Sequence, residues 1–586
     1  MGQQPYRTSG KAHGTSLPAD VPPPEPLLAP VQELKRSFGI DARRLDAVGC
    51  LLADGEFRSV AELVALTGTS RRTVEAVLRA AGPHLESSGE RVRIGEAQAR
   101  AYAAEFGCGQ AEPLRDPWEE LAGRDPAALA EAARLVDRAP APRRELDQVP
   151  ATAVTVLKRG HYLLRSFDLR GAHVLCVGDH DLTSLGLFLA GGAGGLRVSV
   201  VDADERLLEY VDTEAARRGF DVRCYFADLR VGLPASLHGS AQLAFTDPPY
   251  TPEGVRLFVT RGLQGLGDQR NGRLLLAYGF GEQQPALGLA VQEALSPLHL
   301  TYEAVLQGFN RYAGAEAIGG AAALYVLRPT RRSDGAARAG AESIRPELYT
   351  HGAQSAESAA RELGIAAASR ILELAAPPGA APGAGMVLAG GGWPAQAGGE
   401  RLPLSRLITA PLPRSLLEHG TVVVNLYPGF GSLVPRALLA ADACRVAVVC
   451  PNDVPELRDA AGQQHLAELV APKYRITRLL RSVPGPDMAV ILAERAAAAA
   501  PGSAGQLAAY VYARPHGKLG NTWREGLIVA RKSQGTVLTK RDARGVIESV
   551  SARPDLLKHS LIELPGHLFP VLAAEMARSA CASLPA

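Results

Sequence analysis

Residues 173–190 read HVLCVGDHDLTSLGLFLA: an apolar run, a short turn and the start of a helix. A second apolar run follows at residues 198–201, and a further one at residues 241–246. Apolar runs that alternate with helical segments are typical of a parallel sheet wrapped by helices. We therefore expect an α/β protein in which residues 173–177 form the first strand of a Rossmann-like domain.

The turn after this strand is acidic where a dinucleotide-binding turn would be rich in glycine. It reads Gly178-Asp179-His180-Asp181, so two carboxylates stand where a helix N-terminus would hold a pyrophosphate. Two like charges about 4 Å apart repel by roughly 4 kcal/mol at an effective dielectric of about 20. The turn therefore argues against NAD and FAD and favours a cation, such as an adenosyl sulfonium or an amine. One alternative stays open, namely that both aspartates only cap the helix.

Carboxylates also follow the next two strands. Asp202 ends the second strand, at a position where an acidic residue accepts hydrogen bonds from ribose hydroxyls. Asp228 follows the third strand and is a candidate to hold an adenine amino group. Residues 171–330 contain 12 arginines, no lysine and 17 acidic residues, which suits a cationic substrate but also a solvated acidic face. We expect a nucleoside site at the carboxyl edge of this sheet.

The fourth strand ends in DPPYTP (residues 247–252). Its two prolines, Pro248 and Pro249, fix an extended turn and keep the preceding carbonyl out of the strand ladder. The Asp247 carboxylate and the Tyr250 ring would then lie together at the strand end. This pairing suits an amine nucleophile, because carboxylate and carbonyl accept its hydrogens while the ring contacts it by stacking or cation–π interaction. The alternative is a Pro-Pro turn with a structural role only.

Residues 41–94 follow a winged-helix pattern. Helical apolar stripes, a capping-box spacing at Ser59 and Glu62, and a wing-like segment at residues 89–94 support this interpretation. A DNA-binding version would place Arg71 at the start of the recognition helix. However, the segment has eight arginines against eight acidic residues, whereas a phosphate-binding module should be basic. A packing or dimerisation role is therefore favoured over DNA binding.

The overall composition sets limits on function. The 586 residues carry 63 basic and 61 acidic side chains, which is too balanced for a protein that binds polyanions or membranes through its net charge. The seven cysteines form no CxxC pair, so we predict neither a metal site nor a disulfide framework, and a reducing cytoplasm fits. The uncharged stretches are short or broken by Gly and Pro, so no membrane span is expected, and residues 1–30 lack the apolar core of a secretory signal.

Changes in composition predict six segments. We expect a disordered arm (residues 1–40), a winged-helix-like domain (41–98), a helical connector (99–140), a Rossmann-like catalytic domain (141–330), a hinge and linker-rich segment (331–410) and a second Rossmann-like domain (411–586). In the last of these, residues 421–425 resemble a first strand, but the turn after them has no carboxylate. We interpret this domain as a degenerate copy that caps the site or forms a dimer interface, with a second catalytic site as the alternative.

Three segments carry a resemblance to a known family: PRRELDQ (residues 142–148), GDHDLTS (178–184) and DPPYT (247–251). With these segments in this order, residues 41–330 resemble the branched-chain polyamine synthase family, N4-bis(aminopropyl)spermidine synthase. Members of that family join a winged-helix-like domain to a class I methyltransferase-like Rossmann domain. The family's turn reads Gly-Asp-Asp-Asp, so His180 replaces its middle carboxylate here. The replacement leaves three possibilities: His180 acts as a neutral base, the acceptor differs, or activity is lost.

The resemblance implies transfer of the aminopropyl group of decarboxylated S-adenosylmethionine to an amine of spermidine, with release of 5′-methylthioadenosine. The expected site residues are Asp179, His180, Asp181, Asp247 and Tyr250 in catalysis; Gly178, Asp202, Asp228 and Pro248 at the donor; and Asp147, Pro249 and Thr251 at the substrate. Either Asp181 or Asp247 would accept the amine proton. We expect a cytoplasmic homodimer that binds a polyamine and no nucleic acid. Two alternatives stay open: an S-adenosylmethionine-dependent amino-methyltransferase acting on DNA or a small amine, and a non-enzymatic polyamine or adenosyl sensor.

Overall fold

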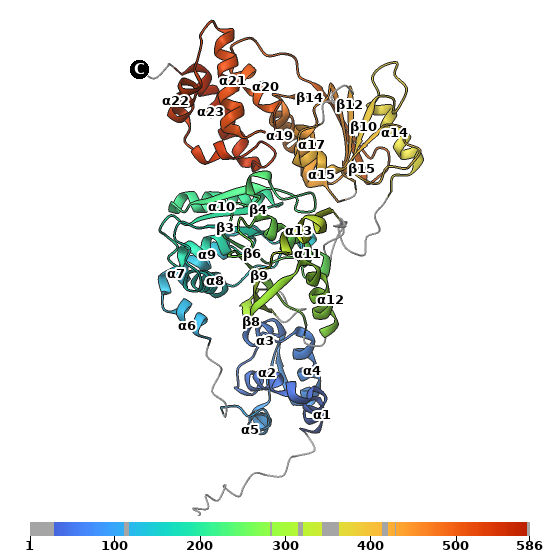
Figure 1. Cartoon of the computed structure of the whole chain (residues 1–586). Coiled ribbons are helices and arrows are strands. Elements are labelled where there is room, and N and C mark those ends of the chain that lie inside the picture. Colours follow the sequence, from blue (N-terminus) through green and yellow to red (C-terminus); the bar gives the residue numbers. More distant parts are fainter. Residues whose placement is uncertain are drawn as a thin grey trace, which may run out of the picture. The chain divides into compact units, whose positions relative to one another are not determined.

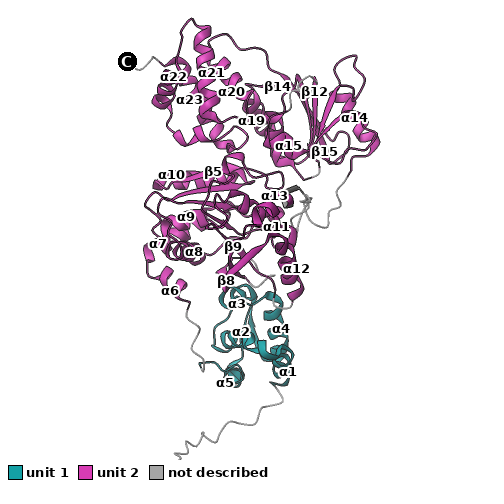
Figure 2. Cartoon of the chain, viewed as in Figure 1, with its two compact units in different colours: residues 1–114 teal, residues 115–586 magenta. Residues whose placement is uncertain are grey.

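The computed structural model describes residues 28–109, 116–281, 284–313, 320–342, 362–412, 420–427 and 429–582. The chain forms two compact units, residues 1–114 and residues 115–586, which Figure 2 shows in teal and magenta. The second unit contains two large sheets, and Figure 1 labels several of their strands. No helix within the described ranges is long and apolar enough to cross a membrane.

The first unit consists of short helices and a two-stranded antiparallel sheet. Its main elements are α1 (Ala29–Phe38), α2 (Arg43–Ala53), α3 (Val60–Thr67), α4 (Arg71–Ala81), β1 (Leu85–Ser88), β2 (Arg91–Ile94) and α5 (Glu96–Glu105). Ser59 and Glu62 form the predicted capping box of α3. Helix α1 lies in the segment that was expected to be a disordered arm. Its Val31 is fully buried in the core of this unit, so the helix has an apolar side that packs there. The expected disorder is therefore wrong for α1, and residues 1–27 lie outside the described residues.

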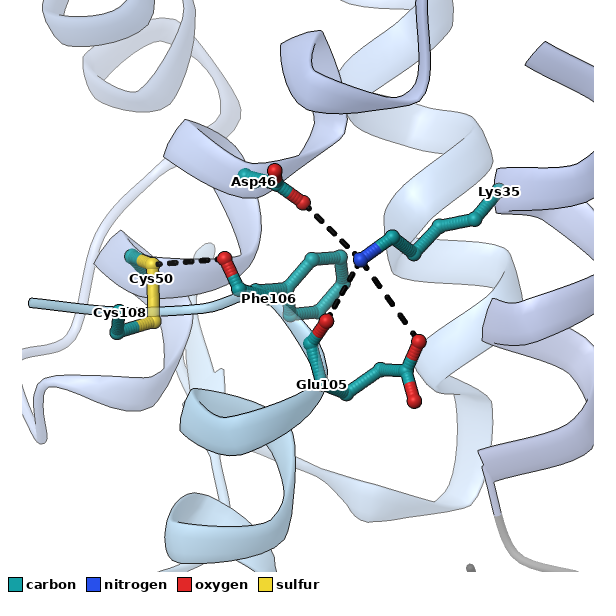
Figure 3. The surroundings of a disulfide bond; sticks show 6 residues. All are labelled: Lys35, Asp46, Cys50, Glu105, Phe106 and Cys108. Carbon is teal, nitrogen blue, oxygen red and sulfur yellow. Dashed lines mark hydrogen bonds and ion pairs between the residues drawn. A yellow bond between two sulfur atoms is a disulfide. The ribbon is translucent and has the colours of Figure 1, made fainter. Parts of the chain in front are cut away.

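A disulfide bond joins Cys50 of α2 to Cys108, which follows α5 (Figure 3). Beside it, the Lys35 ammonium lies 3.2 Å from the Asp46 carboxylate and donates to the Glu105 carbonyl at 2.6 Å. The expectation of no disulfide is therefore wrong. The two cysteines are 58 residues apart, so no spacing rule links them, and only the packing of α2 against α5 brings them together.

The first large sheet has seven strands in the order β5-β4-β3-β6-β7-β9-β8. They are β3 (His173–Val177), β4 (Arg197–Asp202), β5 (Val222–Phe226), β6 (Leu243–Thr246), β7 (Arg273–Tyr278), β8 (Leu300–Arg311) and β9 (Ala321–Pro329). Strands β5, β4, β3, β6 and β7 are parallel, and β9 is antiparallel to both of its neighbours. This is the predicted Rossmann-like order, with β3 as its first strand. We call residues 116–342 the central lobe.

Helices cover both faces of this sheet because side chains alternate along each strand. Val174 and Cys176 of β3 point to the face covered by α8, α9 and α10, whereas Leu175 and Val177 point to the face covered by α11. The helices of the lobe are α6 (Pro117–Gly123), α7 (Pro126–Arg138), α8 (Ala153–Ser166), α9 (Thr183–Leu189), α10 (Glu205–Arg218), α11 (Pro252–Gly265), α12 (Pro285–Leu295) and α13 (Ser333–Glu342). The parallel strands end together at one edge, where the predicted site residues follow them.

The second large sheet has six strands in the order β11-β10-β12-β13-β15-β14. They are β10 (Met386–Ala389), β11 (Glu400–Leu402), β12 (Thr421–Asn425), β13 (Arg445–Pro451), β14 (Tyr474–Arg481) and β15 (Met488–Arg495). Strands β11, β10, β12 and β13 are parallel, and β15 is antiparallel to both neighbours. Strand for strand, this is the order of the central lobe without a counterpart of β5. Strand β10 thus corresponds to β3, and β12 to β6.

This topology corrects two expectations. The segment expected to be a hinge, residues 331–410, contains α13, α14 (Ile365–Ala375), β10, β11 and α15 (Leu404–Thr409), so much of it belongs to the second α/β lobe. Residues 421–425 form the counterpart of the fourth strand, not of the first. The true first strand, β10, has only four residues and lies between stretches rich in Gly, Pro and Ala that mask it.

The second lobe continues into a group of helices, and we call residues 362–582 the C-terminal lobe. Its further helices are α17 (Val434–Ala440), α18 (Pro455–Arg458), α19 (Ala460–Val470), α20 (Ala504–Tyr512), α21 (Leu519–Ser533), α22 (Lys540–Val550) and α23 (Phe569–Cys581). Buried apolar residues of both lobes belong to one hydrophobic cluster. The two lobes are therefore packed together within the second compact unit.

Candidate active site

One cavity lies at the carboxyl ends of β3, β4 and β6, and we call it the site cavity. The predicted site residues in its lining are Asp147, Gly178, His180, Asp202, Asp247 and Pro249. Further lining residues that the sequence did not point to are Leu146, Gln148, Ala203, Leu229 and Phe258. Ligands of open α/β sheets bind outside the carboxyl ends of the strands, so this cavity is the candidate active site.

One end of the site cavity is formed by Gly178 and Asp202. Gly178 has a φ of 73°, and a Cβ there would lie 3.3 Å from the Phe258 ring. Only glycine combines this backbone with so little bulk. The Asp202 carboxylate accepts hydrogen bonds from the backbone of Asp204 at 2.8 Å and of Asp179 at 3.3 Å. These bonds aim its oxygens toward the turn after β3, although burial raises the pKa of Asp202.

Asp179 is wholly buried at the start of α9. Its carboxylate accepts a hydrogen bond from the Ser184 backbone at 3.0 Å and another from the Ser184 hydroxyl. Burial, and next the charge of Asp181, raises the pKa of Asp179 well above its ordinary value. This environment agrees with the capping alternative, and the catalytic role of Asp179 stays a prediction.

A buried arginine that the sequence did not point to connects the acidic turn after β3 with the acidic turn after β6. Arg159 of α8 is 0% exposed, and its guanidinium contacts the carboxylates of Asp181 and, at 2.7 Å, Asp247. It also donates to Asn310 at 2.8 Å and to the Tyr312 hydroxyl at 3.0 Å. Buried charges are stable only when they are paired and hydrogen-bonded, and this guanidinium meets both conditions. One cation therefore offsets part of the negative charge of both turns.

The two aspartates that share this arginine differ in their environment. Asp181 is 2% exposed; burial, the largest single influence, would raise its pKa, but the charge of Arg159 and the hydrogen bonds from Arg159 and the Thr183 backbone act together to lower it. For Asp247, at 9% exposed, burial dominates and raises the pKa despite Arg159. Asp247 also lines the site cavity. Of the two, Asp247 is thus the more basic carboxylate and the one in reach of a ligand.

Two tyrosines hold Asp247 in place at the cavity wall. Its Oδ2 accepts a hydrogen bond from the Tyr312 hydroxyl at 2.6 Å, and its Oδ1 accepts one from the Tyr250 hydroxyl at 3.2 Å. Tyr250 packs edge-on against Tyr278, with ring centroids 5.3 Å apart. Thr251 caps α11 through a bond from Gly254 at 3.0 Å. The DPPYTP turn thus brings Asp247 and Tyr250 together, as expected. Pro248 is buried, and the predicted roles of Pro248 at the donor and of Thr251 at the substrate stay predictions.

His180 contacts the loop that carries Asp147. Its Nε2 atom lies 2.7 Å from the Val149 carbonyl oxygen and 3.0 Å from the Val149 nitrogen, so either tautomer has a partner. Asp147 has a left-handed backbone with φ 51°, and both it and Gln148 line the cavity. His180 therefore fixes the backbone beside two lining residues, and its role as a base stays a prediction.

Asp228 does not line the site cavity, unlike Asp147, Asp202 and Asp247. Its two oxygens bind the Arg230 guanidinium, at 2.9 Å from Nε and 2.5 Å from Nη2. It lines a second cavity, between the two lobes, while its neighbour Leu229 lines the site cavity. The contact of Asp228 with adenine stays a prediction. No group of three or more His, Cys, Asp or Glu side chains within the described residues is arranged to hold a metal ion.

The strand order and the position of the cavity define a class. The sheet has seven strands in this order, with β9 inserted antiparallel, and acidic turns follow its first, second and fourth strands. These features define a class I methyltransferase-like Rossmann domain. Residues 128–357 match the family model "Branched-chain polyamine synthase A C-terminal domain". The resemblance expected from the sequence is thereby confirmed for this part of the chain.

Curated relatives agree with this family. An uncharacterized protein of Methanocaldococcus jannaschii is 34% identical over 30% of this chain and 43% of its own length. The N(4)-bis(aminopropyl)spermidine synthase of Thermococcus kodakarensis is 35% identical over 22% of this chain and 36% of its own length. The chain thus spans less than half the length of these two relatives.

Among solved structures, a similar one is the C9 mutein of the branched-chain polyamine synthase of Thermus thermophilus, in complex with N4-aminopropylspermidine and 5′-methylthioadenosine. It is 24% identical, covers 53% of this chain and 93% of its own, and has a TM-score of 0.38.

Proposed function

We propose that the central lobe transfers the aminopropyl group of decarboxylated S-adenosylmethionine to an amine of a polyamine, such as spermidine, and releases 5′-methylthioadenosine. The observation that carries the proposal is the site cavity, in which the carboxylates of Asp202 and Asp247 line one space after the second and fourth strands. The family match of residues 128–357 and the relative named N(4)-bis(aminopropyl)spermidine synthase support the same reaction.

In this proposal each end of the cavity has its own task. Asp202 binds the ribose hydroxyls of the donor, and Gly178 lets the adenosyl group approach the backbone. At the other end, Oδ1 of Asp247 accepts a hydrogen of the attacking amine, and Tyr250 covers the acceptor. Asp147 offers a further carboxylate to an ammonium group of the polyamine. The cavity residues thus separate a nucleoside end from an amine end.

The chemistry asks for positioning more than for activation. The amine nitrogen attacks the propyl carbon next to the sulfonium, the carbon–sulfur bond breaks with its electron pair going to sulfur, and neutral methylthioadenosine leaves. The nitrogen then gives up one proton, which Asp247 accepts or passes to water. Because burial raises the pKa of Asp247, its carboxylate is a better base than an exposed aspartate. Holding the uncharged amine in line with the carbon supplies the rest.

A donor-and-acceptor assay tests this function. Purified protein is given decarboxylated S-adenosylmethionine and spermidine, and mass spectrometry follows methylthioadenosine and the polyamine. We expect methylthioadenosine release and polyamine masses larger by one or two aminopropyl groups. Consumption of S-adenosylmethionine instead, with S-adenosylhomocysteine as product, would identify an amino-methyltransferase. Binding of spermidine without turnover of either donor would identify a sensor.

The remaining assignments are proposals as well. We propose that residues 41–98 are a winged-helix-like domain with a packing role, since Arg58, Arg71, Arg91 and Arg93 are all paired with carboxylates there. We also propose a homodimer and a cytoplasmic location. The Cys50–Cys108 disulfide offers a test of the location, because disulfides persist mainly in oxidising compartments. Thiol labelling of the protein isolated from its source under acid quench would measure the oxidised fraction.

A further inference from the structure

The segment after β5 separates the site cavity from the cavity between the lobes. Leu229 lines the site cavity, whereas Asp228 and residues 231–235 line the second one. The opposite wall of that second cavity comes from the C-terminal lobe, with Ile408, Leu433, Arg436, His516 and Ile562. One short stretch of backbone therefore faces the candidate nucleoside site on one side and the C-terminal lobe on the other.

Arg230 fastens this stretch to the C-terminal lobe. Its guanidinium binds both oxygens of Asp228 and donates to the Gly429 carbonyl at 2.6 Å. It also lies 4.1 Å from the centre of the Phe430 ring. The side chains of Arg230 and Asp228 are each 4% exposed, so these contacts are made away from bulk water, where charge-assisted hydrogen bonds are strong.

Two further hydrogen bonds hold the backbone on either side of Arg230, one to the C-terminal lobe and one within the central lobe. The Phe226 N–H, at the end of β5, donates to the Glu563 carbonyl of the C-terminal lobe at 2.8 Å. On the side of the central lobe, buried Arg261 of α11 donates to the Leu229 carbonyl at 2.7 Å. The wall of the site cavity is thus held between α11 and the C-terminal lobe, and neither contact alone sets its position.

The part of the C-terminal lobe that meets Arg230 is its own equivalent of the candidate active-site turn. Gly429 and Phe430 follow β12, the counterpart of β6, and therefore correspond in place to the DPPYTP turn. This turn contacts Arg230, the residue next to Leu229 in the wall of the site cavity. This gives the C-terminal lobe a task that its own strand ends, without carboxylates, would not supply.

We propose that the C-terminal lobe positions the nucleoside wall of the site cavity, and that Arg230 is the positioning residue that transmits this effect. The inference rests on the proposed function, because it assumes that the donor nucleoside lies against Leu229. In this inference the C-terminal lobe increases the affinity of the central lobe of the same chain for the donor. Arg230 acts through the backbone of residues 228–230 and touches no reacting atom.

A pair of matched variants tests the inference. Arg230→Met removes the attachment, whereas Arg553→Met removes a different inter-lobe ion pair, with Asp212 of α10 at 2.8 Å. We expect Arg230→Met to raise the calorimetric Kd of methylthioadenosine about tenfold, within the usual range for coupling between sites, and to raise KM for the donor more than it lowers kcat. Arg553→Met should change that Kd by less than about twofold, because no residue of α10 lines the site cavity, whereas Leu229, next to Arg230, does.

A second variant and a second readout keep the test decisive. Phe430→Ala changes only the C-terminal lobe and should speed amide hydrogen exchange of residues 226–233 in the free protein, without any ligand. If wild-type protein bound no methylthioadenosine, the proposed function would fail, and the exchange result would still decide whether the lobe positions the wall. Wild-type Kd in Arg230→Met, or unchanged exchange in Phe430→Ala, would overturn the inference.

Discussion

The two lobes share one strand order, yet their strand ends differ. In the central lobe, the turns after the first and fourth strands contribute Gly178 and Asp247 to a cavity. In the C-terminal lobe the equivalent turns touch each other: a Cβ on Gly390 would lie 2.4 Å from the Asn425 carbonyl oxygen. The Asn425 side chain also donates to the Gly391 carbonyl at 2.8 Å. The central lobe thus has a cavity between its two turns, whereas the equivalent turns of the C-terminal lobe are in direct contact.

The difference between the lobes resides in a few side chains and not in the fold. Asp247 carries a charge that needs a partner, and it shares Arg159 with a second turn. The equivalent Asn425 is neutral, 3% exposed, and satisfied by the two turns themselves, since its Oδ1 also accepts from the Tyr427 N–H at 3.1 Å. Fold similarity alone therefore predicts no second active site, in agreement with the rule that function resides in sites.

The strongest way to break the comparison is to exchange its two key residues. Asp247→Asn should lower turnover by roughly 10²- to 10⁴-fold, because an amide cannot accept the amine proton. The matched change, Asn425→Asp, should leave turnover per folded molecule unchanged, although it buries a carboxylate and lowers the melting temperature. Steady-state kinetics with thermal unfolding measures both. Unimpaired turnover in Asp247→Asn would contradict the assignment of the amine site to the end of β6.

The next largest effect concerns the cation that Asp181 and Asp247 share in the central lobe. Arg159→Met leaves two buried carboxylates without their shared partner, and should destabilise the second unit by about 3 to 5 kcal/mol. Urea unfolding followed by circular dichroism gives this free energy. Arg170→Met is a suitable control, because that arginine is mostly exposed and pairs only at the surface with Asp168. Equal stability of the two variants would contradict the importance assigned to the buried pair.

A smaller effect is expected at the nucleoside end. Asp202→Asn should weaken methylthioadenosine binding by on the order of 1.5 to 3 kcal/mol, because charge-assisted bonds to the ribose are lost. Asp247→Asn should retain that binding. Calorimetry on both variants separates the two ends of the cavity, and the reverse result would exchange the assigned roles.

The smallest effect is a difference in acid response between the lobes. In the central lobe, burial raises the pKa of Asp179 and Asp247, which favours the folded state as pH falls, but burial also lowers the pKa of His173 and His238, which acts in the opposite direction. In the C-terminal lobe, burial lowers the pKa of His516 from 6.5 to about 4, so its contribution to stability is lost as pH falls from 6.5 toward 4.

Hydrogen exchange measured per lobe at two pH values, corrected for intrinsic rates, tests this difference. From pH 7 to about pH 5, we expect protection to fall first in the C-terminal lobe, since the histidine there begins to take up a proton on unfolding. His516→Gln keeps a donor for the Leu407 carbonyl, which His516 Nε2 faces at 3.1 Å, and should abolish the response. An identical pH dependence in this variant would assign the effect to other groups.

Much of the central lobe could be predicted because its signals are local. The apolar run of β3, the acidic turn after it and the DPPYTP turn are each contiguous in sequence, and their positions follow from strand order. Arg159 could not be found in this way, because it lies in a helix before the sheet begins and meets its partners only in the folded protein. The one local sign is a Lys-Arg pair, residues 158–159, between the apolar pairs Val156-Leu157 and Leu163-Leu164. Asn310 and Tyr312 come from β8 and just after it, still further away.

The C-terminal lobe was harder to predict for a related reason. Strand β10 is four residues long and has glycine-rich flanks, so its sequence signal is weak and the sequence predicts β12 as the first strand instead. Cys50 and Cys108 illustrate the same limit, since their pairing depends on helix packing and not on spacing. Short elements and long-range pairs are set by tertiary contacts, which a single sequence does not display.

The guanidinium shared by two turns also constrains how this site can change by mutation. Because Arg159 serves Asp181 and Asp247 at once, a substitution at any of the three alters the cost of substitution at the other two. Losing one carboxylate leaves a pair, losing the arginine leaves two unpaired anions, and replacing all three with apolar residues of similar volume costs least. A path that loses one carboxylate first therefore keeps the remaining charges paired, whereas a path that loses the arginine first passes through the least stable form. The arginine is thus the member of the three that is hardest to replace first.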